Sequence, residues 1–274
     1  MFKERNPGSR AAWSHMQAIN MNRRLEVTNA ARRLLGGASL LLLYSALHKP
    51  ISALLPKTIR PIPGTVLDLS EGKVFVREPS IDLPYIPGDE MTFNPPAQAL
   101  LLIAIAASFI GAAWTRREAT LALSTMCWSM LLNLMVTDVL KNYTGVLRPN
   151  FYAGCGWSDE ERRCTKEFHA GRHAFPSGHS AAAAVLAHGL ALYLLRVSRL
   201  ADPRGALLMR AAAIVPWLLA LWVASSRLVD YYHHPADVVA GVAIGAICAW
   251  SAFGAHFTLP GGGEHAFVVQ GEIL

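Results

Sequence analysis

The stretch VVAGVAIGAICAWSAFGA, residues 238–255, contains 18 residues and no Asp, Glu, Lys, Arg or His side chain. An α-helix needs roughly 20 apolar residues to cross the hydrocarbon core of a bilayer. Two further stretches, residues 97–114 and 119–136, have the same length and also lack these five residue types. The sequence therefore predicts a chain that crosses a membrane several times.

Three weaker apolar stretches bring the number of predicted spans to six. Residues 180–195 contain only His188 of the five polar types, and residues 207–226 contain only Arg210. Residues 34–47 are the weakest, because 14 residues are short for a span. The predicted fold is all-α: a polytopic membrane protein with a bundle of six transmembrane helices.

Two of these spans contain residues that affect helix packing. Gly241 and Gly245 lie four residues apart, so they share one helix face and allow a neighbouring helix to approach closely. Pro216 lies within the fifth span, where contacts with other helices allow a proline to be tolerated. We therefore expect close packing on one face of the sixth helix.

The composition excludes several other classes of protein. Charged residues make up 16% of the chain and apolar residues 53%, whereas soluble proteins average about 25% charged residues. The long uncharged stretches also argue against disorder and against a small disulfide-rich module. The net charge of +6 would suit nucleic acid, but the basic residues fall in short clusters between apolar stretches. We therefore expect the bilayer as a partner and no nucleic acid.

The positions of the basic residues predict the orientation of the bundle. Six spans place both termini on one side, and Lys and Arg divide almost equally between the two sides. Short loops next to spans carry the most weight, and the loops at Arg116–Arg117 and residues 196–210 are basic. We therefore expect both termini in the cytosol, a membrane domain over residues 34–257 and a cytosolic tail over residues 258–274.

The N-terminal residues 1–33 are polar and basic, and they are predicted to form a cytosolic tail. Trp13, Met16 and Ile19 could line one side of a helix at the membrane surface. Because this pattern is short, a loosely ordered tail is favoured over such a helix.

Three polar motifs lie at the ends of the third to sixth predicted spans. They read KNYTGVLRP (residues 141–149), FPSGHS (175–180) and SRLVDYYHHPAD (226–237). The predicted topology places all three at the non-cytosolic boundary of the membrane. Charged groups at a membrane boundary are costly without a role, so the three motifs predict one functional site.

The basic and small residues of these motifs suit a phosphoryl group. Arg148 and Arg227 present planar sets of N–H donors to phosphate oxygens, and Lys141 adds a third positive charge. Ser177 is a favourable N-cap, and Gly178 allows the backbone to approach a ligand. The start of the fourth span therefore predicts an anion-binding helix N-terminus.

The two histidines and the aspartate can divide the chemistry of phosphoryl transfer. His233 and Asp237 lie four residues apart, so the carboxylate can hold one ring nitrogen while the other attacks phosphorus. His179 can donate a proton to the leaving oxygen and later accept one from water. The predicted intermediate is a phosphohistidine.

The three motifs resemble those of the type 2 phosphatidic acid phosphatase superfamily, specifically its integral-membrane lipid phosphate phosphatase branch. The resemblance covers roughly residues 78–250, and every fixed position of the family pattern is matched. The family implies six helices, cytosolic termini, an extracellular or lumenal active site, and no metal or other cofactor. Carried over by position, it implies phosphate binding by Lys141, Arg148, Ser177, Gly178 and Arg227, and catalysis by His233, His179 and Asp237.

Some neighbouring residues leave alternatives open. His234 lies three residues from Asp237 and could replace His233 geometrically, although the family spacing selects His233. A metal site made by these three residues is disfavoured, because a metal would not need three cations nearby. Asp138 lies three residues before Lys141, and we expect it to support that lysine.

The loops on the predicted active side raise two further questions. Cys155 and Cys164 could form a disulfide if their loop is lumenal, and the sequence leaves this open. Asn142 begins a glycosylation sequon that we expect to be unused, because it adjoins the membrane and Lys141. Residues 48–96 are expected to lie over the site.

The combined pattern predicts a metal-independent phosphatase that acts on phosphatidic acid, lysophosphatidic acid, diacylglycerol pyrophosphate or related lipid phosphates. One alternative is a lipid phosphotransferase of the sphingolipid synthase kind, and another is a non-catalytic protein that binds lipid phosphates. A homo-oligomer is left open.

Overall fold

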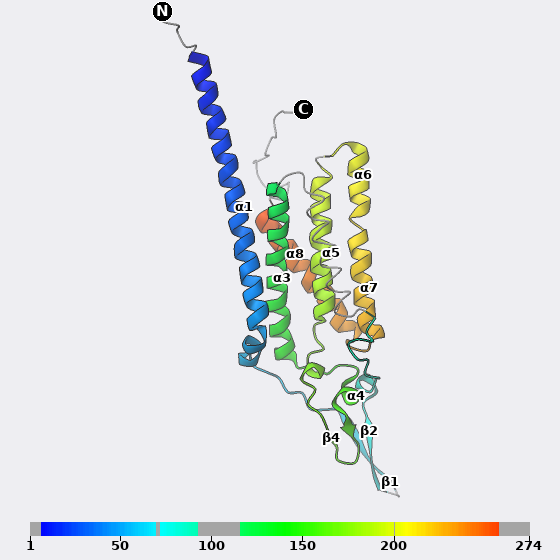
Figure 1. Cartoon of the computed structure of the whole chain (residues 1–274). Helices are drawn as coiled ribbons and strands as arrows, with labels where there is room; N and C mark the ends of the chain where they lie inside the picture. The colour runs from blue at the N-terminus through cyan, green and yellow to red at the C-terminus, as the bar shows by residue number, and fades with distance from the viewer. Residues whose placement is uncertain (1–6, 70–71, 93–115, 200, 258–274) are drawn as a thin grey trace, which may run out of the picture.

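The computed structural model describes residues 7–69, 72–92, 116–199 and 201–257. Long helices run side by side, and two short hairpins lie beyond one end of them (Figure 1). The helices of the bundle are α1 (Pro7–Leu54), α3 (Arg116–Thr144), α5 (Gly178–Val197), α6 (Pro203–Ala212), α7 (Val215–Val229) and α8 (Pro235–His256). The short elements are β1 (Gly64–Leu69), β2 (Gly72–Arg77), η1 (Pro79–Ile81), α4 (Phe151–Cys155), β3 (Trp157–Ser158), β4 (Arg163–Cys164) and η2 (His169–Arg172).

Five helical segments among the described residues are long and apolar enough to cross a membrane. They are Val27–Leu54, Glu118–Thr144, Gly178–Val197, Pro203–Val229 and Pro235–His256. Each contains one of the predicted spans, so the all-α polytopic membrane fold is confirmed. The second predicted span, residues 97–114, and the predicted tail 258–274 lie outside the described residues, and the count of six therefore stays a prediction.

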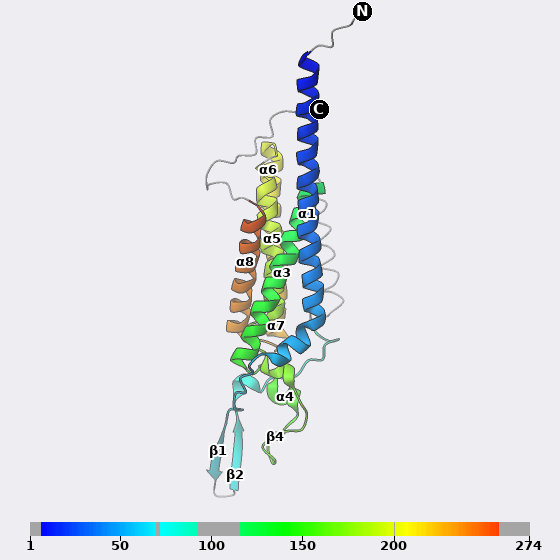
Figure 2. The ribbon, with the colours of Figure 1, turned by 90° about the vertical axis from the view of Figure 1, so that its left-hand side faces the viewer.

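The first helix begins much earlier than the sequence pattern indicated. α1 is continuous from Pro7 to Leu54, so the expectation of a loosely ordered segment up to residue 33 is wrong from Pro7 onward. Residues 7–33 are rich in Ala, Arg and other residues with high helix propensity, which explains how the helix can extend beyond the apolar part. Its N-terminal part extends past the other helices (Figures 1 and 2).

The fifth predicted span consists of two consecutive helices. α6 ends at Ala212 and α7 begins at Val215, with Pro216 in the first turn of α7. A proline in a first turn removes no helical hydrogen bond, because the N–H groups there have no partner within the helix. Pro216 therefore starts a helix rather than interrupting one.

Close packing of α5 against α8 joins the second and third motifs. A Cβ added to Gly241 would lie 2.4 Å from the Ser177 carbonyl oxygen, and one added to Gly245 would lie 2.1 Å from that of Ala181. The small face predicted for the sixth span is confirmed. Because the helices touch at backbone level, their first turns are held next to each other.

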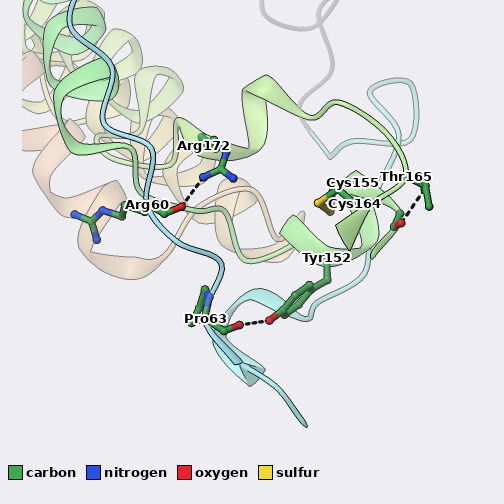
Figure 3. Close-up of a disulfide and its surroundings, with 8 residues drawn as sticks. Arg60, Pro63, Tyr152, Cys155, Cys164, Thr165 and Arg172 are labelled. Carbon is green, nitrogen blue, oxygen red and sulfur yellow. Dashed lines mark hydrogen bonds between the residues drawn. A yellow bond between two sulfur atoms is a disulfide. The ribbon is translucent and has the colours of Figure 1, made fainter. Parts of the chain in front are cut away.

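The hairpins and α4 form a layer beyond the ends of the helices. β1 pairs antiparallel with β2, and β3 pairs antiparallel with β4. A disulfide joins Cys155 to Cys164, which answers the question that the sequence left open. Near it, the Tyr152 hydroxyl donates to the Pro63 carbonyl, which connects α4 to the start of β1 (Figure 3).

Replacing Gly245 by alanine should destabilise the protein, because the new methyl group would clash with the backbone of α5. Overpacking of this kind costs about 1–3 kcal/mol. Gly254→Ala is the matched control in the same helix, since nothing lies within 4 Å of a Cβ there. Thermal unfolding in detergent should show a lower Tm for Gly245→Ala only. An equal Tm for both variants would contradict the close packing.

Candidate active site

The first motif begins on the last turn of α3, where Lys141 lies beside the start of α5. A Cβ added to Gly178 would lie 2.8 Å from the Lys141 Nζ. The absent side chain of Gly178 therefore provides the space that the ammonium group occupies. This contact joins the first motif to the second.

The second motif forms the N-terminus of α5 as predicted. Ser177 is the N-cap, and its hydroxyl oxygen accepts from the Ser180 N–H at 3.4 Å. The Ser177 N–H in turn donates to the Asp237 carbonyl oxygen at 2.9 Å. Ser177 is fully buried, so the N-terminus of α5 is fixed against the first turn of α8.

Arg227 comes from the last turn of α7 and is fully buried. Its Nη2 donates to Asp230 Oδ2 at 2.9 Å and to the Ser226 hydroxyl at 3.0 Å. Asp230 is itself only 2% exposed. Asp230 was not among the residues predicted for the site, although its place three residues after Arg227 is a signal for a pair on one helix face.

The backbone fixes the tautomer of His233. Its Nδ1 lies 2.7 Å from the Ala174 carbonyl oxygen, which can only accept a hydrogen bond. Nδ1 must therefore carry the hydrogen, and Nε2 keeps a lone pair. Burial lowers the pKa of His233 to about 4, and the nearby Asp237 carboxylate offsets only part of this effect. The ring is therefore neutral at pH 7.

Asp237 contacts His234 more closely than it contacts His233. Its Oδ2 accepts from the His234 backbone N–H at 2.8 Å and lies 3.1 Å from the His234 Nδ1. The distance to the His233 Nδ1 is 3.8 Å. Our expectation placed the hydrogen bond on His233, whereas the structure gives it to His234, because Asp237 is the third residue of α8 and His234 is its N-cap.

His234 is held at both ring nitrogens. Nδ1 faces Asp237, and Nε2 lies 3.2 Å from the Ser80 carbonyl oxygen. The hydrogen bond to Asp237 raises the pKa of His234 above its ordinary value. The two adjacent histidines therefore differ. His233 has a ring nitrogen with a lone pair, whereas both ring nitrogens of His234 have hydrogen-bond partners.

His179 and Arg148 complete the group. His179 is the second residue of α5, and the charges of Arg227, Lys141 and Arg148 all act on its ring. The Arg148 guanidinium lies 4.9 Å from the centre of the Tyr232 ring. Burial lowers the pKa of Arg148 to about 10, which still leaves it charged at pH 7. The structure thus gathers all eight predicted site residues at one end of the bundle.

Asp138 hydrogen-bonds to α1, and its charge also acts on Lys141, in line with the expected support. Its Oδ2 accepts from the Tyr44 hydroxyl of α1 at 2.9 Å, and the described residues show no ion pair between Asp138 and Lys141. The carboxylate therefore connects α3 to α1. Among the residues that the structure describes, no three His, Cys, Asp or Glu side chains form a group able to hold a metal.

Comparison with known families agrees with the motifs. The model of the PAP2 superfamily matches residues 122–260, which include all three motifs and the helices α5 to α8. The chain belongs to the PAP2 superfamily. The match begins within α3, so α1 and the β1–β2 hairpin of this PAP2 protein lie outside it.

Curated relatives of this PAP2 protein have names that refer to lipid phosphates. Lipid phosphate phosphatase 2 of Arabidopsis thaliana is 32% identical over 53% of this chain and 56% of its own length. A putative phosphatidate phosphatase of Drosophila melanogaster is 32% identical over 43% of this chain and 37% of its own. A probable diacylglycerol pyrophosphate phosphatase 1 of Schizosaccharomyces pombe is 26% identical over 46% of this chain and 53% of its own length. The chain spans about half the length of these relatives.

The buried, neutral state of His233 should make stability depend on pH. Its pKa is about 4 in the folded protein and about 6.5 in the unfolded chain, so the unfolded chain takes up the proton as pH falls. The stability that His233 contributes is present above pH 6.5 and falls by about 3 kcal/mol toward pH 4. His233→Asn should reduce the decrease in Tm between pH 7 and pH 5.

The matched control is His169→Asn, because the His169 side chain is 84% exposed. This variant should keep the pH dependence of the wild type. If His233→Asn and His169→Asn show the same change of Tm with pH, His233 is not held neutral by burial.

Proposed function

We propose that this protein hydrolyses the terminal phosphate of a membrane lipid through a phosphohistidine intermediate, without a metal. The substrates are phosphatidic acid, lysophosphatidic acid, diacylglycerol pyrophosphate or related lipid phosphates. The observation that carries the proposal is the state of His233, whose Nδ1 is fixed by Ala174 and whose Nε2 keeps its lone pair. This neutral nucleophile lies in a group with three cations.

In the first step, the Nε2 of His233 attacks phosphorus and the bond from phosphorus to the lipid oxygen breaks. Lys141, Arg148 and Arg227 stabilise the negative charge on the phosphoryl oxygens. His179 gives its proton to the leaving lipid oxygen. The Asp237 carboxylate, 3.8 Å from the His233 ring, stabilises the positive charge that forms on it.

In the second step, water attacks the phosphohistidine from the side opposite His233. His179, now neutral, accepts a proton from this water, and the bond between phosphorus and Nε2 breaks. Orthophosphate leaves, and both histidines return to their starting states. Three positive side chains supply the charge that a metal ion supplies in other phosphatases.

The position of the site supports a lipid substrate. Lys141 lies on the last turn of one candidate span, and His179 and Asp237 lie on the first turns of two others. A phosphate headgroup can therefore reach the three cations while its acyl chains stay in the bilayer. The names of the relatives agree with this substrate class.

The disulfide supports an extracellular or lumenal position of the site. Disulfides persist in oxidising compartments and are rare in the cytosol, and the bond between Cys155 and Cys164 lies in the layer at the site end of the bundle (Figure 3). The basic loops at Arg116–Arg117 and residues 196–210 then face the cytosol, together with the N-terminus.

Replacing His233 by asparagine should abolish phosphate release from detergent-solubilised phosphatidic acid. Asparagine can still donate toward the Ala174 carbonyl, but it has no nucleophilic ring nitrogen. The loss should be about 10³-fold or more, as for removal of other catalytic nucleophiles. The assay measures orthophosphate, with His169→Asn as the control that should match the wild type.

The wild type and His169→Asn should keep their activity in excess EDTA, because no step of the mechanism uses a metal. Activity retained by His233→Asn would overturn the assignment of His233 as the nucleophile. Loss of the wild-type activity in EDTA would overturn metal independence alone.

Hydrolysis and headgroup transfer can be separated by their products. Arg148 and Arg227 lie in the same site, and two guanidinium groups favour a terminal phosphate, which carries more negative charge than a diester. With labelled phosphatidic acid and a second lipid as acceptor, the label should appear as orthophosphate. Label in a new phospholipid would favour a phosphotransferase, and no reaction at all would favour a protein that only binds lipid phosphates.

A further inference from the structure

Residues 79–92, here called the covering segment, run from the end of β2 to the end of α7 (Figure 1). They lie outside residues 122–260, which match the family model. Contacts along the segment reach residues of the first and third motifs. These contacts are Ser80 O to His234 Nε2 at 3.2 Å, Leu83 N to Pro149 O at 2.9 Å, Ile86 O to Tyr232 Oη at 2.7 Å and Met91 Sδ to Arg227 Nη1 at 3.6 Å.

Asp230 connects this segment to the phosphate-binding group. Its Oδ1 accepts from the Thr92 hydroxyl at 2.7 Å and from the Thr92 backbone N–H at 3.2 Å. Its Oδ2 accepts from Arg227 Nη2 at 2.9 Å. One buried carboxylate therefore binds both Arg227, three residues before it, and Thr92, 138 residues before it in the sequence.

We propose that Asp230 is a positioning residue that holds the Arg227 guanidinium and the covering segment in one fixed arrangement around the substrate phosphate. The proposal rests on the proposed function, since it takes Arg227 to bind that phosphate. It adds a specific role for a residue between the fixed positions of the motif. It also makes the covering segment a fourth part of the site.

The physical reason lies in the freedom of an arginine side chain. A guanidinium binds phosphate through two parallel N–H donors in one plane, and a misplaced guanidinium loses this pair of hydrogen bonds. The bond to Asp230 restricts the guanidinium before substrate arrives. The bonds from Asp230 to Thr92 keep the segment over Arg227, which excludes water and strengthens the attraction to phosphate.

Asp230 could instead act only as a counterion that neutralises a buried Arg227. A buried charge without a partner is strongly destabilising, so loss of the pair alone would explain a damaged Asp230 variant. The contact with Thr92 separates the two roles. A counterion role does not involve Thr92, whereas the positioning role requires it.

Thr92→Val therefore tests the proposal directly. Valine has nearly the shape of threonine but no hydroxyl group, so the 2.7 Å side-chain bond to Asp230 is lost, while the backbone N–H bond and the Arg227–Asp230 pair remain. We expect the KM for phosphatidic acid in mixed micelles to rise about tenfold, with kcat within about twofold, because a bond to a charged acceptor is lost. The control Thr65→Val, at an exposed position of β1, should leave both constants unchanged. Equal constants for the two variants would overturn the proposal.

A double-mutant cycle gives the second test. Asp230→Asn, compared with the exposed Asp68→Asn as control, should raise KM more than Thr92→Val does. Adding Thr92→Val to Asp230→Asn should change KM by less than twofold, because the bond is already weakened. A full tenfold further increase would overturn the proposal. If Asp230→Asn does not fold, Thr92→Val against Thr65→Val decides alone.

Hydrogen exchange of residues 79–92 separates this proposal from the proposed function. Thr92→Val should accelerate exchange in the covering segment about tenfold relative to wild type, whereas Thr65→Val should not. A wild-type protein that releases no phosphate would overturn the proposed function. Unchanged exchange in Thr92→Val would overturn the positioning role, whether or not the wild type is active.

Discussion

A backbone hydrogen bond from the Ser177 N–H to the Asp237 carbonyl oxygen joins the first turns of α5 and α8. The two turns can meet at backbone level only because Gly241 has no side chain, since a Cβ there would lie 2.4 Å from the Ser177 carbonyl. The N-terminus of α5, with Gly178 and His179, is thereby placed next to the segment that carries His233. The distance between the first turn of α5 and the proposed nucleophile is thus set by helix packing, which is more rigid than a loop.

The charges of the site are arranged for an anion. Lys141, Arg148 and Arg227 lie close enough for their charges to act on His179. Among the described acidic side chains, Asp230 forms an ion pair with Arg227, and Asp237 is bound to His234. Burying like charges together is costly unless a ligand neutralises them. A bound phosphate would supply the neutralising negative charge. In the proposed mechanism the same three cations would then stabilise both the bound phosphate and the transition state.

Five of the spans, and the three motifs that the structure brings together, could be predicted because their signals are local in the sequence. An apolar stretch such as residues 238–255 indicates a helix without knowledge of its neighbours, and the motif that contains Lys141 and Arg148 is identified by its resemblance to a known family. The early start of α1 was missed because its first residues are polar, and polar residues with high helix propensity resemble a tail.

Contacts between distant segments could not be read from the sequence. The bond from His233 to Ala174 joins residues 59 apart, and it involves a carbonyl that every residue has. The bonds between Thr92 and Asp230 join a loop to a helix end. The pairing of Asp230 with Arg227 could have been predicted, because an acidic residue three positions after an arginine on a helix favours an ion pair. The contact of Asp230 with Thr92 could not. Prediction of the disulfide between Cys155 and Cys164 would have required knowledge of the fold and of the redox compartment, and the sequence gives neither directly.

The adjacent histidines show how the backbone assigns different chemistry to two identical side chains. Tyr231 has φ +56°, a left-handed conformation that is uncommon outside glycine, and the chain turns there between α7 and α8. After this turn, His233 faces the Ala174 carbonyl, and His234 becomes the N-cap of α8 with Pro235 in the first turn. The N-cap position brings His234 to Asp237, which raises the pKa of His234, whereas burial lowers the pKa of His233 and keeps that ring neutral. A nucleophile must have a lone pair, and of the two rings it is His233 whose Nε2 keeps one, which is why we propose His233 as the nucleophile.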